Sequence, residues 1–194
     1  MNQAFTFVSA EIPEHVRLEM SGRSWHPDPQ CPAFDELRLL TLSHHGFDGA
    51  IHQGELVVHR DVSQEVEQIF ARLFELGFAI ERMQRIDAYG GNDDASMTAN
   101  NSSAFNFRRI QGSALLSHHA LGKAIDLNPI QNPWVRGERV DPEAGRAYLA
   151  RDLARAGMIV DPGPVIETFA AHGWYWGGHF RDMQDYHHFS KLPR

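Results

Sequence analysis

The stretch Leu116-Ser-His-His-Ala-Leu-Gly-Lys-Ala-Ile-Asp-Leu-Asn128 places a serine, two histidines, a glycine and an aspartate within thirteen residues. A second stretch near the end of the chain, Asp185-Tyr-His-His-Phe189, adds a carboxylate and two more histidines. Imidazole and carboxylate are the usual nitrogen and oxygen ligands of zinc, and two histidines with one aspartate leave a fourth position open for water. We therefore expect the two stretches to build one zinc site.

The first stretch has the pattern of a turn followed by a short strand. In a strand over residues 123–127, Ile125 and Leu127 would face the core and Asp126 the opposite, open face. Gly122 interrupts the chain just before this strand, so a histidine of the preceding turn can fold back beside Asp126. The spacing alone leaves an alternative, which is an ordinary loop histidine next to a surface strand.

The second stretch offers a ligand and a catalytic carboxylate together. Strand alternation would put Tyr186 and His188 on one face and His187 on the other, with Asp185 able to reach the same pocket as His188. A carboxylate beside a zinc site can take a proton from water and later deliver it to a leaving amine. The alternative is a histidine pair that caps a buried edge strand.

Length and composition limit the classes of protein. The chain has 194 residues, 42% of them hydrophobic, which is enough for one well-buried domain. Eighteen Lys and Arg against twenty-five Asp and Glu give a net charge of −7, which argues against a general nucleic-acid-binding surface. The single cysteine, Cys31, excludes an internal disulfide and a cysteine-rich zinc finger. We expect no membrane span, because no long apolar run is present, and no export signal, because the N-terminus lacks a basic and an apolar region.

Hydrophobic spacing outlines the first half of the fold. Residues 1–54 are expected to form an irregular N-terminal lead-in packed on the domain, with short extended pieces such as Arg38–Leu42. We expect short strands at 56–58 and 78–80. The clearest helix lies between them, because apolar residues recur there every three or four positions, at Val62, Val66, Ile69, Leu73 and Leu76.

The second half alternates loops with shorter elements. Residues 87–107 are rich in Gly, Asn, Asp and Ser, and such a long segment in a small domain suggests a functional loop. We expect one helix at 142–156, with Leu149 and Leu153 on its inner side, and another after Pro164. Helices mixed with short strands, without regular βαβ alternation, predict a single α+β domain around a small antiparallel sheet.

The two motifs together resemble a known family. The pattern Ser117-x-His119-x-x-Gly122-x-Ala124-x-Asp126, followed by Asp185-x-x-His188-Phe189, is similar to that of the zinc D,D-carboxypeptidase and L-alanyl-D-glutamate endopeptidase family (VanX- and VanY-like). The resemblance covers roughly residues 55–190 and implies the hedgehog/D,D-peptidase fold, with a zinc peptidase domain over residues 55–194. His-Glu-x-x-His, Gly-x-Ser-x-Gly and phosphate-loop motifs are absent from the sequence.

The resemblance implies a role for each matching residue. His119, Asp126 and His188 would be the ligands of one zinc ion per chain, with His118 and His187 outside the pattern. Asp185 takes the position of the catalytic carboxylate. Arg108 takes that of the arginine that stabilises the oxyanion, with Arg109 as its competitor. Ser117 and Trp176 are assigned to substrate binding. His179, which follows Trp-Gly-Gly, is a further candidate for a substrate contact.

The implied function is zinc-dependent hydrolysis of peptidoglycan stem peptides, with a D-alanyl-D-alanine carboxypeptidase as the first hypothesis. An L-alanyl-D-glutamate-type endopeptidase, or a zinc-containing binding module of the same fold without catalysis, is the alternative. The expected partners are peptidoglycan peptides that contain D-amino acids, and the expected location is the periplasm or the cell wall.

Overall fold

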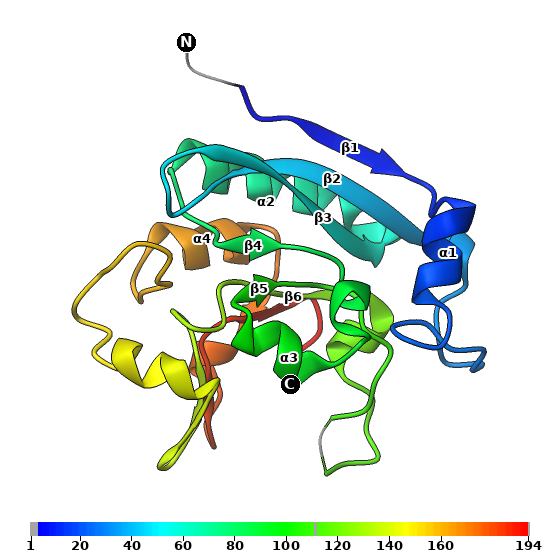
Figure 1. Ribbon diagram of the computed structural model, residues 1–194. Coiled ribbons are helices and arrows are strands. Elements are labelled where there is room, and N and C mark those ends of the chain that lie inside the picture. The colour runs from blue at the N-terminus through cyan, green and yellow to red at the C-terminus, as the bar shows by residue number, and fades with distance from the viewer. Residues whose placement is uncertain (1–3, 111, 194) are drawn as a thin grey trace.

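The computed structural model describes residues 4–110 and 112–193, and its longest strands form a hairpin near the N-terminus. Strand β2 (Leu37–His45) pairs antiparallel along its whole length with β3 (Ile51–His59). Strand β1 (Phe7–Ala10) pairs antiparallel with the other edge of β2, which gives the order β1-β2-β3 (Figure 1). Residues 1–54 are therefore more regular than the expected lead-in, because a nine-residue strand runs through them.

Helix α2 (Ser63–Glu75) covers one face of this hairpin (Figure 1). Its buried apolar residues are spaced three, one and three apart, as expected for one face of a helix, and this confirms the predicted helix. These residues are joined in the main core by apolar side chains from β2 and β3. The two groups are Val66, Ile69, Phe70 and Leu73 from the helix, and Leu40, Leu42, Leu56 and Val58 from the strands.

A second sheet carries both motifs. Strand β11 (His188–Ser190) lies between β6 (Ala124–Asp126) and β9 (Tyr175–Trp176), antiparallel to each. Helix α4 (Pro164–Ala171) begins at the predicted proline and packs on this sheet, where Phe169 stacks on Phe189 with ring centroids 3.8 Å apart. The same core thus supports the N-terminal hairpin and the strands of the motifs.

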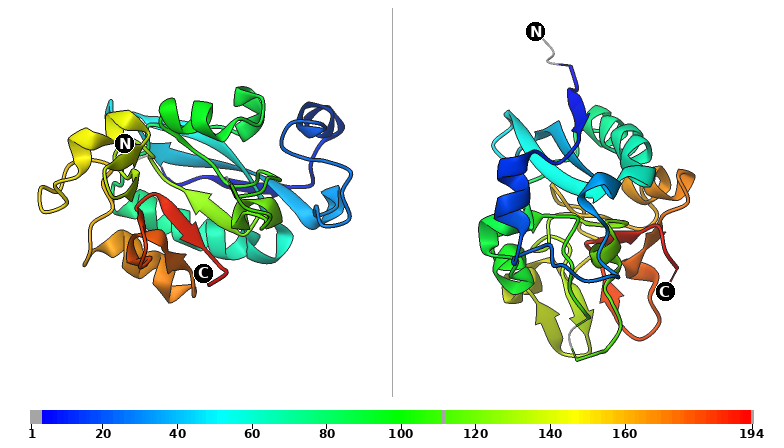
Figure 2. Two further views of the ribbon diagram at one scale, coloured as in Figure 1. Left: turned by 90° about the horizontal axis from the view of Figure 1, so that it is seen from below. Right: turned by 90° about the vertical axis from the view of Figure 1, so that its right-hand side faces the viewer.

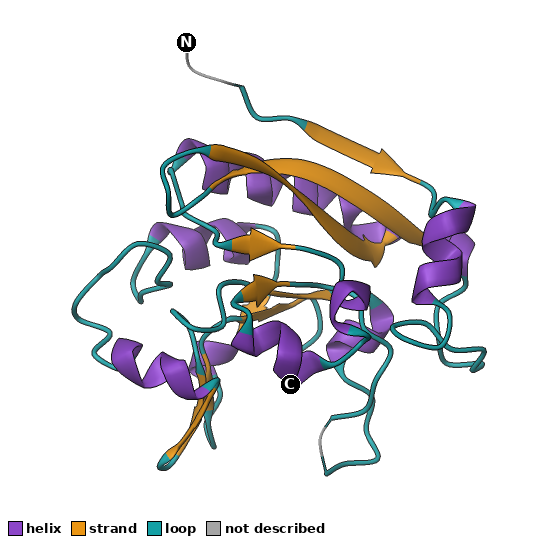
Figure 3. Cartoon of the chain, in the orientation of Figure 1, coloured by secondary structure: helices purple, strands orange, loops and turns teal. Residues whose placement is uncertain are grey.

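A third sheet projects from the domain at the lower left of Figure 1. Its hairpin, β7 (Trp134–Arg136) and β8 (Arg139–Asp141), is antiparallel, and β10 (Gln184–Asp185) pairs with the other edge of β7. Two very short strands, β4 (Arg82–Met83) and β5 (Asn101–Ser102), form a parallel pair. Long loops connect these elements in the second half of the chain (Figure 3).

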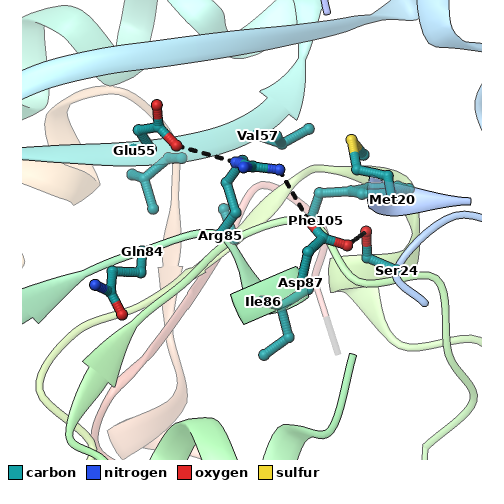
Figure 4. A pocket seen from close by; sticks show the side chains of 11 residues that line it. Met20, Ser24, Glu55, Val57, Gln84, Arg85, Ile86, Asp87 and Phe105 are labelled. Atoms are coloured by element: carbon teal, nitrogen blue, oxygen red, sulfur yellow. Dashed lines mark hydrogen bonds and ion pairs between the residues drawn. The ribbon is translucent and has the colours of Figure 1, made fainter. Parts of the chain in front are cut away.

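An ion cluster with one buried member, Asp87, joins the N-terminal segment to the rest of the domain (Figure 4). The guanidinium of Arg85 donates to Glu55 of β3 at 3.0 Å and to Glu19 of α1 (Glu14–Met20) at 2.6 Å. Its Nη1 lies 3.6 Å from the carboxylate of Asp87, which is buried and accepts a 2.6 Å hydrogen bond from the Ser24 hydroxyl. One arginine side chain therefore connects three separate segments.

Two local predictions are wrong. Residues 142–156 form only a short 3-10 helix at Glu143–Tyr148, and Leu149 and Leu153 are exposed instead of facing the core. Without a buried face, a longer helix lacks the packing that stabilises helices in proteins. Residues 78–80 form no strand, only an isolated bridge between Ala79 and His45, because the chain turns into β4 two residues later.

The structure also tests the expected organisation of the chain. The expected boundary between residues 54 and 55 falls inside β3, so both sides contribute to one sheet. The right-hand view of Figure 2 shows the cyan strands of this sheet beside the teal helix α2. The expected loop at 87–107 contains helix α3 (Asp93–Thr98) and strand β5. Within the described part of the chain, every helix is too short or too polar to cross a membrane. The structure confirms the predicted α+β class, with small, mostly antiparallel sheets and few helices.

Candidate metal centre and active site

His119 is positioned by a tight turn. Residues His118–Leu121 form a 3-10 helix in which the hydroxyl of Ser117 accepts a 3.3 Å hydrogen bond from the backbone N–H of His119. Gly122 ends the turn with φ +65° and lies against β3, where a Cβ atom would come within 2.6 Å of the backbone nitrogen of His59. Only glycine fits this position without displacing backbone, which explains the glycine of the motif.

The ring of His119 is oriented for ligation by its other nitrogen. Its Nδ1 lies 2.6 Å from the backbone carbonyl of Ala104, so a proton on Nδ1 is donated to that oxygen. This hydrogen bond selects the tautomer that leaves a lone pair on Nε2 and aims it into the site, as is common for metal-binding histidines.

The antiparallel register of β6 and β11 places Asp126 directly opposite His188. Nδ1 of His188 lies 3.0 Å from Oδ1 of Asp126 and 3.1 Å from Nε2 of His119. Nε2 of His119 in turn lies 3.2 Å from Oδ2 of Asp126. The structure thus brings together three residues that the two motifs supply separately.

These three residues fit a zinc ion. Each offers one ligand atom, and these atoms all lie within 4.8 Å of one another. Ligands in a tetrahedral zinc site with bonds of 2.0–2.1 Å are about 3.3 Å apart, close to the separations found here. Two imidazole nitrogens and one carboxylate oxygen form the donor set of a catalytic site that keeps a fourth position open.

The charges of the cluster depend on one another. Burial favours the neutral form of Asp126, but the cationic histidines His119 and His187 outweigh it and hold the pKa of this carboxyl well below its usual range. Burial likewise disfavours the charged form of His119, yet the carboxylate of Asp126 outweighs it and raises the pKa of this imidazole. The site therefore keeps a carboxylate deep inside the protein.

Asp185 and His187 form a second pair beside this cluster. Nε2 of His187 lies 2.9 Å from Oδ1 of Asp185 and 3.8 Å from Oδ2 of Asp126, and its Nδ1 lies 2.8 Å from the backbone carbonyl of Asn132. Burial opposes the charge on His187, but the two aspartates outweigh it and raise its pKa to about 10. Burial also opposes the charge on Asp185, but His187 lowers the pKa of Asp185 below its ordinary value.

The position of His187 differs from that expected for a continuous strand. The chain turns between β10 and β11, so His187 and His188 both reach the site instead of alternating across a sheet. The resemblance left His187 outside the pattern, and the Asp-x-His spacing to Asp185 is the only local signal in the sequence that connects the two side chains.

Arg108 lines the same cavity as His188 of β11. Its Nη2 forms a 2.6 Å ion pair with Oδ2 of Asp93, the first residue of α3, so the segment expected as a functional loop helps to hold this arginine. Arg109, the competitor, also lines the cavity, but its guanidinium donates to the backbone carbonyl of Ala114 in its own loop. Arg108 is thus held by a residue of a separate element and Arg109 by its own loop, and the choice between them stays a prediction.

His119, Asp126 and His188 line a cavity of about 630 Å³. The cavity walls come from α3, the segment around residue 109, the β7–β8 hairpin and the turns that flank β10. Its lining includes Asp93, Asp94, Arg108, Arg109, Ser117, His118, His119, Asp126, Trp134, Arg136, Arg139, Asp141, Phe180, Met183, Asp185, His187 and His188. Sequence reasoning missed the hairpin residues of this wall, because nothing in their local pattern relates them to the motifs.

The residues assigned to substrate binding occupy different places. Ser117 lines the cavity, whereas Trp176 is buried in the core, donates to the backbone carbonyl of Tyr186 and is not among the lining residues. His179 is exposed and lies 2.9 Å from the carboxylate of Asp161, also outside the lining set. The substrate contacts of Ser117 and Trp176 remain predictions.

A comparison with models of protein families identifies one match. Residues 111–191 match a family described as D-alanyl-D-alanine carboxypeptidase. This segment contains His119, Asp126, Asp185, His187 and His188, and over these residues the match agrees with the family and the class of enzyme that the motifs predict. It also implies the hedgehog/D,D-peptidase fold. Searches of curated proteins and of solved structures find no match.

Proposed function

We propose that the chain, whose residues 111–191 match the D-alanyl-D-alanine carboxypeptidase family, is a zinc peptidase that removes terminal D-alanine from peptidoglycan stem peptides. The observation that carries the proposal is the His119, Asp126 and His188 cluster at a cavity that also contains the carboxylate of Asp185. The periplasm or the cell wall, where such peptides occur, is the proposed place of action.

His119, Asp126 and His188 would hold the metal. Zinc bound there would supply a Lewis acid that acidifies a water molecule and polarises the scissile carbonyl. The hydrogen bond from His119 to the Ala104 carbonyl orients one ligand, and the pairing of β6 with β11 orients the other two. The ligands are therefore held by backbone elements before any metal arrives.

Asp185 is proposed as the general base and then the general acid. Its lowered pKa keeps the carboxylate ionised at neutral pH, so it can accept a proton from the attacking water. The same carboxyl group then donates this proton to the nitrogen of the leaving amine. His187 positions Asp185 through their 2.9 Å contact and is itself held by the Asn132 carbonyl.

Arg108 is proposed to bind the scissile carbonyl oxygen. A guanidinium directed at the oxygen on which negative charge develops stabilises the tetrahedral state more than the substrate. The ion pair with Asp93 restricts Arg108 to the cavity wall, which reduces the reorganisation needed at the moment of reaction. Ser117, at the start of the His118–Leu121 turn, is proposed to hydrogen-bond the substrate backbone.

The direct test is digestion of a muropeptide mixture by zinc-loaded protein, with the products identified by mass spectrometry. We expect release of terminal D-alanine by the wild type and by Asp182→Ala, an exposed neighbour that does not line the cavity. We expect no release by Asp185→Ala. An internal cut would identify an endopeptidase instead, and zinc binding without any product would identify a binding module.

A further inference from the structure

The β7–β8 hairpin presents one entire face to the cavity. Trp134 and Arg136 on β7, and Arg139 and Asp141 on β8, all line it. The alternating residues on the other face are apolar, and Val140 is buried among them. Since side chains alternate along strands, the hairpin is amphipathic, with its polar face turned toward the metal cluster.

The register sets the two arginines of this face side by side. Arg136 pairs directly with Arg139, as Trp134 does with Asp141. Like charges directly opposite on antiparallel strands are destabilising. One carboxylate, Asp141, lies 3.1 Å from Arg139, and Arg139 also covers the Trp134 ring at 5.3 Å. Among the described residues, none forms an ion pair with Arg136. The arginine pair therefore has one carboxylate for two positive charges.

The hairpin is held next to Asp185. Trp134 is the β-sheet partner of Asp185, and its indole N–H donates to the sulfur of Met183 at 2.8 Å. Arg136 follows two residues further along β7, on the same face of the strand, which places its Cα about 7 Å beyond that of Trp134. Arg136 thus lies two residues along β7 from the strand partner of the proposed acid, and Arg139 lies beside Arg136 on β8, one strand further from β10.

This position corresponds to the part of the substrate that is released. In the proposed reaction, Asp185 protonates the nitrogen of the leaving residue, so that residue must lie against β10. The wall next to β10 is the β7–β8 hairpin. A leaving residue with a free carboxylate would supply a second negative charge for the two arginines. Guanidinium groups bind carboxylates through charge-assisted hydrogen bonds.

We propose that Arg136 and Arg139 form a carboxylate subsite that binds the terminal carboxylate of the residue released by cleavage. The proposal rests on the proposed function, which supplies the reaction and the direction of the substrate. In the free protein Asp141 occupies part of this subsite through its ion pair with Arg139, so a substrate carboxylate competes with it. The hairpin would then favour removal of a terminal residue over cleavage inside a chain.

The test uses two peptides that end in D-alanyl-D-alanine, one with a free carboxylate and one with a terminal amide. For zinc-loaded Arg136→Gln/Arg139→Gln we expect KM for the acid to rise about tenfold or more, the loss expected for one to two charge-assisted hydrogen bonds. KM for the amide and kcat for both peptides should stay near wild type. Asp141→Asn should lower KM for the acid, because it frees Arg139.

A matched control removes an arginine of the same kind outside the cavity. Arg146 is exposed, paired with Glu143 in the segment after β8, and does not line the cavity, so Arg146→Gln should leave both KM values unchanged. The melting temperature of Arg136→Gln should equal or exceed that of the wild type, because the substitution relieves a like-charge pair. A lower melting temperature would assign Arg136 a structural role and overturn the subsite.

A binding measurement distinguishes an error in the carboxylate subsite from an error in the proposed reaction. Calorimetry with zinc-loaded Asp185→Ala measures binding of the two peptides without turnover. If the wild type cleaves neither peptide but the double substitution still weakens binding of the acid alone, the reaction is wrong and the subsite stands. If the double substitution affects the acid and the amide equally, or neither, the subsite is wrong even where hydrolysis is observed.

Discussion

Asp185 lies beside the cluster of His119, Asp126 and His188, and we expect substitutions at Asp185 and at His188 to remove different functions. His188 contacts both other members of the cluster, at 3.0 Å and 3.1 Å, whereas Asp185 reaches it only through His187. We therefore expect His188 to hold the proposed metal and Asp185 to carry out the proposed proton transfer.

This difference predicts opposite results for two alanine substitutions. Asp185→Ala should retain one zinc per chain and lose activity by about 10²- to 10⁴-fold, the usual contribution of a general acid–base group. His188→Ala should lose both, because two ligands hold zinc much more weakly than three. Metal analysis of the dialysed proteins, with turnover measured in parallel, checks this. Wild-type turnover in Asp185→Ala would refute its role.

His44 gives the protein a pH dependence independent of the metal site. This histidine of β2 is buried, and burial lowers its pKa below 6.5, while the nearby His52 adds to the effect and the His45 carbonyl opposes it. The unfolded chain therefore binds a proton that the folded chain excludes. Stability is fully present above about pH 6.5, the unfolded pKa, and falls as the pH drops below it.

Replacing His44 with phenylalanine should reduce this loss, because an apolar ring of similar size has no proton to exclude. We expect the difference in melting temperature between pH 7.5 and pH 5 to be smaller for His44→Phe than for the wild type. Thermal unfolding followed by circular dichroism at both pH values measures it. An equal or larger difference in the variant would show that His44 does not contribute to the acid-side loss.

At the level of elements, α2 and the β2–β3 hairpin form the part of the fold whose local sequence agrees with its structure. The helix buries one face with a three- and four-residue spacing, and it ends close to the residue that the periodicity predicts. By contrast, the segment after β8 has helical spacing but no core to face, and it remains mostly irregular. Periodicity predicts an element only where tertiary packing covers its apolar face.

The energetic weight of α2 is testable with a single leucine. Leu73 is 1% exposed and packs in the main core, so Leu73→Ala should lower the free energy of unfolding by about 2–5 kcal/mol. Leu18 on α1 is 69% exposed, and Leu18→Ala should change it by less than about 0.5 kcal/mol. Urea denaturation of both variants gives the comparison. Similar values for the two would contradict the assignment of the core.

At the scale of the whole molecule, Arg85 connects the N-terminal segment to the half that carries the site. It contacts Glu19 of α1, Glu55 of β3 and the buried Asp87. Residues 1–54 also supply β1, β2 and much of β3, so the first sheet depends on both sides of the expected boundary. Metal centre and N-terminal sheet therefore share one core and should unfold together.

Arg85→Met should destabilise the protein by about 1–3 kcal/mol, because it leaves the buried carboxylate of Asp87 without its cation. Arg72→Met, which breaks an exposed ion pair with Glu75 on α2, should cost at most about 0.5 kcal/mol. Denaturant unfolding measures both. A single transition in Arg85→Met is expected, and two separate transitions would show that the N-terminal sheet folds independently.

The sequence by itself determined the candidate ligands and their order, the resemblance to a family, the α+β class and helix α2. These features depend on residues close together in the chain: a histidine turn ended by Gly122, a strand with Asp126, and a short motif with Asp185 and His188. A local pattern is sufficient where the geometry is local.

Only the tertiary structure decided how these parts meet. The strand register sets Asp126 opposite His188, although the two residues are 62 positions apart. The turn after β10 breaks strand alternation and brings His187 to Asp185. The pairing of β7 with β10 places Arg136 and Arg139 at the cavity. Residues 1–54, expected to be an irregular lead-in, contribute to a sheet because β2 pairs with β3 and packs on α2. Strand pairing and burial depend on contacts between segments that are distant in the sequence. The free energy of these contacts therefore cannot be inferred from any short stretch alone.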